Sequence, residues 1–239
     1  MKRTIKLFLV VALMATSVTL VNAQKAKKPF SGTITFALSY DGVEPAQLAQ
    51  MPTSTVMKIS ENKQKTTVDL GQYAYVSVTD GDIESSIFWI DVMGQKLGYN
   101  LDKATLDKAK TEDTSPKPVI TKSEETKEIA GVKCNKMTIV STDEETGDVT
   151  TSTIWYSEEL GFNEKLNFMS SDRGITGIVL GTETSDGKMT NKSYATLIKK
   201  EKIKSTEFLI PADAEMSKSV KEFSENMKAK FGGGGGDDE

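Results

Sequence analysis

The stretch FSGTITFALSY, residues 30–40, sets the pattern for the rest of the chain. Its large apolar and aromatic side chains share one parity, and most of its small hydroxyl-bearing side chains occupy the other. A period of two is expected for a strand with one buried face. Asp41 and Gly42 follow at once and favour a turn. The stretch therefore predicts a half-buried strand that ends in a turn.

Short runs separated by turn residues continue through the first half. Further strands are predicted at residues 54–60, 63–70, 73–79, 83–93 and 95–101. The run at 83–93, IESSIFWIDVM, is apolar on both parities after Ile87, so this strand should be covered on both faces. A short irregular or helical piece is expected at 43–50, a short helix or a loop at 102–110, and an exposed connection at 111–118.

The second half repeats this pattern and ends differently. Strands are predicted at 127–129, 136–142, 149–157, 175–184 and 189–203. Apolar side chains then recur at spacings of three or four, which predicts one apolar stripe on a C-terminal helix. The stripe consists of Met216, Val220, Phe223, Met227 and Phe231. We expect this helix to pack on the sheet rather than on a membrane surface, because its polar face mixes Lys with Glu.

These patterns predict a mainly β (α+β) fold, either a single curved antiparallel sheet or an open half-barrel with a C-terminal amphipathic helix. One β-rich domain should span residues 30–231. A flexible N-terminus is expected at 24–29, and a disordered tail of glycines and acids at 232–239.

The first 23 residues predict export. Lys2, Arg3 and Lys6 precede an apolar run over residues 7–21 that is shorter than a membrane span. Val21 and Ala23 are suited to signal-peptide cleavage between Ala23 and Gln24, and Gln24 offers no thiol for lipid attachment. We therefore expect a periplasmic or extracellular protein with no membrane span after processing.

Composition restricts the possible chemistry. The chain of 239 residues has 30 basic and 34 acidic residues, no His and one Cys. Removing residues 1–23 takes away three basic residues and no acidic one, which leaves 27 basic against 34 acidic residues, a net charge of −7. An acidic chain is a poor nucleic-acid binder, and without His it lacks the commonest general base and metal ligand.

Motifs for a cofactor or a metal are not convincing. Residues 232–236 are five glycines, but three acids follow them instead of the Lys and helix of a phosphate loop. Residues 143–148 resemble a calcium loop in composition but not in ligand spacing, so a solvated hairpin tip is the better interpretation. We expect no cofactor and no metal.

The single thiol, Cys134, has no His partner for nucleophilic chemistry. We expect it to be an inert packing residue next to the turn at Gly131.

Four short motifs carry a family resemblance. They are F-x-G-x-I-x-F at 30–36, I-A-G-x-x-C-x-K at 129–136, W-Y-S-x-E-L at 155–160 and G-I-x-G-I-V-L at 174–180. Together they resemble the secreted bacterial families of unknown function that include the GLPGLI family. That resemblance implies a relative of the outer-membrane lipoprotein carrier fold, in which helices plug the concave side of an open half-barrel.

The predicted function follows from this fold and from the missing catalytic groups. We expect a non-enzymatic envelope protein that binds a hydrophobic ligand, such as a lipid, or a lipidated protein. The predicted lining consists of Phe36, Leu38, Ile87 and Trp89. Two alternatives stay open: a structural or protein-interaction module of the envelope, and a hydrolase built on carboxylates.

Overall fold

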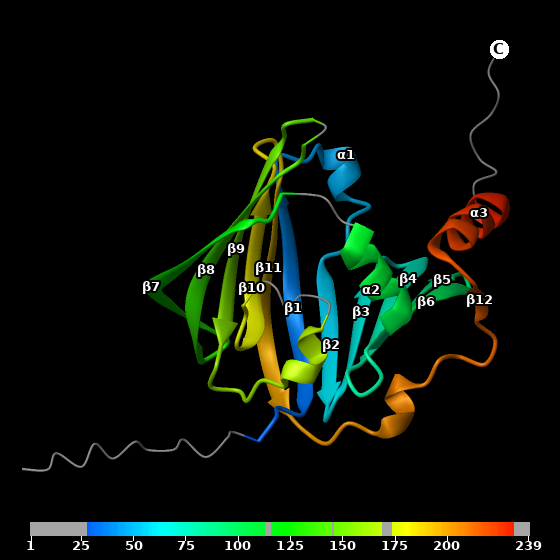
Figure 1. The fold of residues 1–239 in the computed structure, drawn as a ribbon, viewed down its shortest axis with the longest axis horizontal. Coiled ribbons are helices and arrows are strands. Elements are labelled where there is room, and N and C mark those ends of the chain that lie inside the picture. The colour runs from blue at the N-terminus through cyan, green and yellow to red at the C-terminus, as the bar shows by residue number, and fades with distance from the viewer. Residues whose placement is uncertain (1–27, 113–115, 145, 169–173, 232–239) are drawn as a thin grey trace, which may run out of the picture.

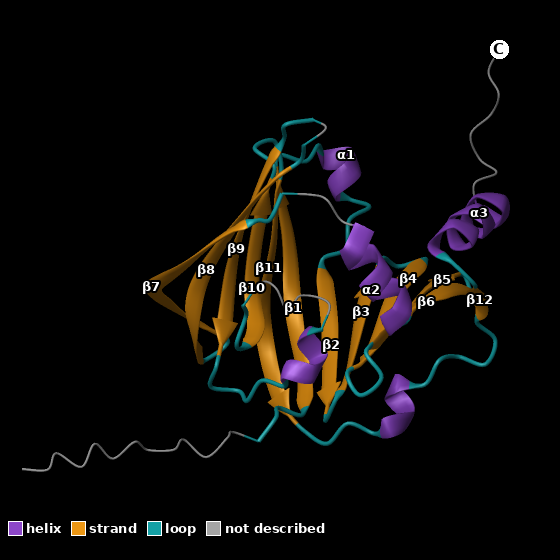
Figure 2. Cartoon of the chain, viewed as in Figure 1, coloured by secondary structure: helices purple, strands orange, loops and turns teal. Residues whose placement is uncertain are grey.

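The computed structural model describes residues 28–112, 116–144, 146–168 and 174–231. The predicted signal peptide, its cleavage site and the C-terminal tail lie outside the described residues. Figure 2 shows one continuous sheet with short helices around it.

The strands are β1 Gly32–Asp41, β2 Ser54–Ser60, β3 Lys63–Asp69, β4 Tyr73–Asp80, β5 Ser85–Val92, β6 Gln95–Leu101, β7 Val119–Ile129, β8 Val132–Thr142, β9 Val149–Ser157, β10 Ile178–Ser185, β11 Thr190–Lys200 and β12 Glu215–Ser217. The helical elements are α1 Pro45–Leu48, α2 Lys103–Glu112, α3 Val220–Phe231 and the 3₁₀ turns η1 Glu164–Asn167 and η3 Ser205–Phe208.

All twelve strands belong to one open sheet in the order β12-β6-β5-β4-β3-β2-β1-β11-β10-β9-β8-β7 (Figure 1). Neighbouring strands are antiparallel except β12, which pairs with β6 in parallel. The mainly β fold with a single open sheet and a C-terminal helix is therefore confirmed, with one parallel pair added at the edge.

Tight turns fix the register of the meander. Met93 and Gly94 both have positive φ, 52° and 89°, between the paired residues Val92 and Gln95. Two positive φ values are typical of the two-residue turns whose twist matches that of a hairpin.

The sheet curves strongly at its β7 end. Three strands separate β7 from β11 in the sheet order. Even so, the Lys127 Nζ of β7 lies 4.2 Å from the ring centroid of Tyr194 in β11. The end of β7 therefore curls back over one face of the sheet.

The strand β5 is covered on both faces, as its sequence predicted. On one face Ile90 and Val92 pack with Leu97 of β6 against Phe223, Met227 and Phe231 of α3. On the other face Trp89 packs with Val76, Val78, Ile203 and Phe208.

The apolar stripe of the C-terminal helix is shorter than expected. Met216 belongs to β12, and Val220 at the start of α3 is exposed. Met216 precedes Val220 by a helical spacing of four, but here it sits on an edge strand that pairs with β6.

Candidate functional site

The connection between β9 and β10 crosses the sheet instead of making a tight turn. We call residues 158–177 the crossing segment, of which 158–168 and 174–177 are described. Its 3₁₀ turn η1 is the yellow-green coil in front of β1 and β2 in Figure 1. Adjacent antiparallel strands can be joined by a short loop, so this connection is far longer than the β9–β10 pairing requires.

Two side chains anchor the crossing segment to distant hairpin turns. The Nδ2 of Asn163 donates to the carbonyl oxygen of Glu61 at 2.8 Å and to Oδ1 of Asn62 at 2.6 Å. The Nζ of Lys165 lies 2.7 Å from Oδ1 of Asp82. These bonds hold the segment over the β2–β3 and β4–β5 turns.

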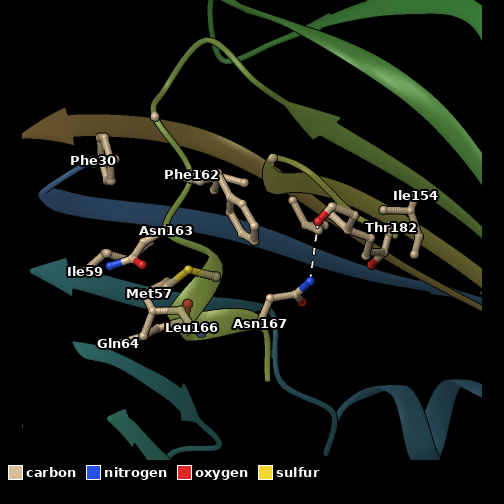
Figure 3. Close-up of a pocket in the computed structure, with 15 residues that line it drawn as sticks. Phe30, Met57, Ile59, Gln64, Ile154, Phe162, Asn163, Leu166, Asn167 and Thr182 are labelled. Atoms are coloured by element: carbon tan, nitrogen blue, oxygen red, sulfur yellow. Dashed lines mark hydrogen bonds between the residues drawn. The ribbon is translucent and has the colours of Figure 1, made fainter. Parts of the chain in front are cut away.

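A cavity of about 300 Å³ lies between the crossing segment and the sheet (Figure 3). Its wall is mostly apolar and consists of Phe30, Met57, Ile59, Gln64, Ile154, Gly161, Phe162, Asn163, Leu166, Asn167, Ile175, Gly177, Ile178, Val179 and Thr182. This volume is at the lower end of the range for small-molecule sites, and the mixture of apolar walls with a few polar groups is typical of them.

The polar groups of the wall are neutral. They come from Gln64 on β3, Thr182 on β10, and Asn163 and Asn167 on the crossing segment. The Nδ2 of Asn167 donates to the carbonyl oxygen of Ile175 at 3.4 Å, which ties the two sides of the segment together. No charged side chain is among the described lining residues. The cavity therefore suits an apolar group and offers little to a charged one.

The cavity opens on a sheet face that is uncharged across six strands. Cross-strand partners point to the same side of a sheet, so the register defines rows of side chains. Three rows run from β1 to β6: Ile34–Met57–Thr66–Ser77–Phe88–Tyr99, Phe36–Thr55–Val68–Tyr75–Ile90–Leu97 and Gly32–Ile59–Gln64–Thr79–Ser86–Leu101. We call this side the uncharged face.

The opposite face of the same strands carries the charges. The paired positions of β2–β6 include seven ionic residues, and all seven alternate to that side: Lys58, Lys63, Lys65, Asp69, Asp80, Asp91 and Lys96. Burial alone does not explain why one face lacks charges. Tyr75 lies on the uncharged face and is 52% exposed, so a charged side chain could reach solvent there. The uncharged face is thus partly open to solvent without carrying charge.

The four residues predicted to line a ligand site do not lie together. Phe36 and Leu38 point to the uncharged face from β1, whereas Ile87 and Trp89 point to the opposite face from β5. Phe36 is buried in the main core cluster, which also holds Ile34 and Leu180. Trp89 is buried in a separate cluster with Phe208 of η3. None of the four is among the residues that line the cavity.

Sequence reasoning missed the crossing segment. Phe162 and Leu166 were not assigned to any element, although their spacing of four is the one local signal of a shared face. The last family motif does reach the site, because Ile175, Ile178 and Val179 line the cavity. Gly177 also belongs to this motif. A Cβ atom there would lie 2.5 Å from the carbonyl oxygen of Ser157, so only glycine fits at this position.

Cys134 is a buried packing residue, as predicted. Its side chain is 0% exposed and belongs to the main core cluster. Its Sγ donates a weak hydrogen bond to the carbonyl oxygen of Val132 at 3.5 Å. Burial, assisted by the charge of Glu159, raises the pKa of the thiol from 9.0 to about 11. A thiol that stays protonated is a poor nucleophile.

The raised pKa of Cys134 predicts a loss of stability at alkaline pH. Above pH 9 the unfolded thiol releases its proton while the folded thiol keeps it until about pH 11, so unfolding becomes more favourable as pH rises through this window. A pKa difference of about two units between the folded and the unfolded thiol corresponds to a loss of about 2–3 kcal/mol in the free energy of unfolding. Urea unfolding at pH 8 and near pH 10.5 should show a smaller alkaline loss for Cys134→Ala than for the wild type. Equal losses in both proteins would show that the thiol does not titrate as described.

A second prediction concerns packing at the same position. Cys134→Ser should lower the free energy of unfolding by about 1–3 kcal/mol, because a hydroxyl buried among apolar side chains has a larger desolvation cost than a thiol. Cys134→Ala should cost less. Thermal unfolding at neutral pH measures both, and rapid maleimide labelling of the native wild type would argue against burial.

The described residues hold no group of three or more side chains suited to a metal ion. Among the same residues no helix is long and apolar enough to cross a membrane.

Comparison with known proteins gives no family for the chain. No protein-family model and no curated protein sequence matches it. Similar solved structures include LprF from Mycobacterium bovis, at 10% identity over 77% of this chain and 90% of that chain, with a TM-score of 0.32. A DUF1329 family protein from Desulfovibrio piger is similar over 79% of this chain and 93% of that chain, at 10% identity and with a TM-score of 0.34. A beta-barrel-like protein with the DUF1849 domain of unknown function, from Brucella abortus, is similar over 73% of this chain and 99% of that chain, at 9% identity and with a TM-score of 0.28.

Likenesses this distant carry no argument about what the present chain does. The resemblance to the GLPGLI family stays a prediction.

Proposed function

We propose that this chain is a non-enzymatic protein of the bacterial envelope that binds the apolar part of a hydrophobic ligand or of a lipidated partner. The observation that supports this most directly is the cavity of about 300 Å³ between the crossing segment and the uncharged face. Its apolar walls, few neutral polar groups and position beneath an anchored loop favour a bound hydrocarbon group.

Burial supplies the binding energy in this proposal. Each methylene removed from water contributes about 0.8 kcal/mol, so even a short stretch of an acyl chain gives useful affinity. Met57 in the wall adapts to irregular shapes because its side chain is unbranched. The side chains of Asn163 and Lys165 and a backbone hydrogen bond from the Phe30 N–H to the Gly161 carbonyl oxygen at 2.9 Å hold the crossing segment in place as one wall of this cavity.

The structure offers less to the hydrolase alternative. A carboxylate-based mechanism needs two acids at the reacting bond, and no Asp or Glu is among the described residues that line the cavity. The interaction-module alternative rests on a different observation, namely the exposed Tyr73 and Tyr75 on the uncharged face. It predicts a partner protein over these tyrosines and an empty cavity.

The test is native mass spectrometry of the protein purified from the envelope of an expressing bacterium. We expect adducts with the masses of amphiphilic molecules, which organic extraction should release and identify. Titration of the delipidated protein with the neutral dye N-phenyl-1-naphthylamine should show saturable fluorescence. The absence of both adducts and saturable dye binding would refute the proposal.

A further inference from the structure

A second hollow lies at the same end of the sheet as the cavity. It is a wide open cleft of about 1210 Å³ between the start of β1, the β2–β3 turn and the strap that leads from β11 into η3. We call it the basic cleft. Its walls consist of Lys28, Pro29, Ser31, Ser60, Glu61, Asn62, Lys63, Asp82, Glu201, Lys202, Ile203, Lys204, Ser205, Thr206 and Phe208.

Most of the acidic charge in the basic cleft is already paired. Asp82 binds Lys165 at 2.7 Å, and Glu201 binds Lys199 at 2.7 Å. Glu61 is the one acid of the wall without such a pair among the residues that the structure describes.

The basic side chains are mostly unpaired. Lys63 binds Asp80 at 2.5 Å. Lys28, Lys202 and Lys204 form no ion pair with any described residue, and all three are exposed. Three free ammonium groups facing one free carboxylate give a local positive potential on a chain whose net charge is −4. Such a cleft attracts anions.

The basic cleft and the cavity share their walls. Phe30 lines the cavity while its neighbours Pro29 and Ser31 line the cleft. At the end of β2, Ile59 lines the cavity and Ser60 lines the cleft. Asn163 of the cavity wall binds directly to Glu61 and Asn62 of the cleft wall. A molecule with an apolar part and a charged part would meet both hollows at this rim.

We infer that the ligand is an anionic amphiphile whose apolar chain occupies the cavity and whose phosphate or carboxylate headgroup lies in the basic cleft. This inference rests on the proposed function. Lysine suits such a headgroup because its ammonium is a mobile point charge with three donors, and Ser60, Ser205 and Thr206 add hydroxyl donors in the same wall. Because the lysines are exposed, their contribution should weaken as salt rises.

Competition against the dye tests the headgroup assignment. Dodecyl phosphate and the neutral monolauroylglycerol carry chains of equal length, so their difference isolates the headgroup. We expect the wild type to bind dodecyl phosphate about tenfold more tightly at low salt, because partly screened contacts to three lysines add to chain burial. The triple variant Lys28→Gln, Lys202→Gln, Lys204→Gln should lose this preference and keep its affinity for monolauroylglycerol.

The matched control replaces three exposed lysines elsewhere, Lys108→Gln, Lys188→Gln and Lys221→Gln, and should keep the preference. If neither amphiphile displaces the dye, the proposed function itself fails. If both bind equally to the wild type, or if the two triple variants behave alike, the headgroup inference fails while the binding function stands. If inorganic phosphate alone binds the wild type as tightly as dodecyl phosphate in calorimetry, the basic cleft is a free-anion site and the headgroup inference is overturned.

Discussion

Gly32→Ala should destabilise the protein more than any other single-methyl addition considered for this sheet. A Cβ atom at Gly32 would lie 2.1 Å from the carbonyl oxygen of Lys199 and 2.8 Å from the ring of Phe30. Gly32 pairs with Lys200 on β11 and with Ile59 on β2, so relief requires moving strands at the centre of the sheet order. We expect a loss of about 3 kcal/mol or more in the free energy of unfolding.

For a chain of this size that loss corresponds to a melting temperature lower by about 6–12 °C. Differential scanning calorimetry measures it directly. Gly187→Ala is the control, because φ is +86° there but no atom lies within 4 Å of the added methyl group. Its cost should be the conformational one alone, about 1–2 kcal/mol. A Gly32→Ala protein that melts with the wild type would mean that β1 and β11 are not packed as closely as described.

The same contact explains the first family motif. In F-x-G-x-I-x-F the ring of Phe30 lies over the position where Gly32 lacks a side chain, while Ile34 and Phe36 enter the core. The alternation of large residues was visible in the sequence, but the need for glycine was not. That need comes from the backbone of β11, which lies 167 residues further along the chain at Lys199.

Strands with one buried face were predictable to within a few residues. The strands at 54–60, 95–101 and 149–157 have the predicted bounds. By contrast, β7 begins at Val119, although its first predicted residue was Lys127. Residues 121–128 are exposed on both sides because β7 is an edge strand, and a strand without a buried face shows no alternation to recognise.

The candidate site was harder to predict because it depends on register and on a long connection. A period of two shows that Phe36 and Trp89 are each on one side of a strand, but not that they are on opposite sides of the sheet. That relation passes through the register of four strand pairings in turn, from β1 to β5. The crossing segment likewise owes its position to Asn62 and Asp82, which precede their partners Asn163 and Lys165 by 101 and 83 residues, so no local sequence pattern could reveal these contacts.

Leu166→Trp should abolish most of the ligand binding while leaving the fold intact. Leu166 lies on η1 in the wall of the cavity and is only half-buried, so a larger side chain can turn inward without displacing a strand. An indole that takes the place of three ligand methylenes removes about 2.4 kcal/mol of burial, which is roughly a sixty-fold loss of affinity. Dye titration and competition by monolauroylglycerol measure this loss.

The matched control is Leu197→Trp, which makes the same chemical change on β11. Leu197 is 58% exposed and pairs with Thr35, whose side chain points away from the uncharged face. This variant should bind the dye as the wild type does, and both variants should melt near the wild-type temperature. If Leu166→Trp binds normally while remaining folded, the ligand does not occupy the cavity below the crossing segment. Binding would then have to be sought on the open part of the uncharged face around Tyr75, where the interaction-module alternative places a partner protein.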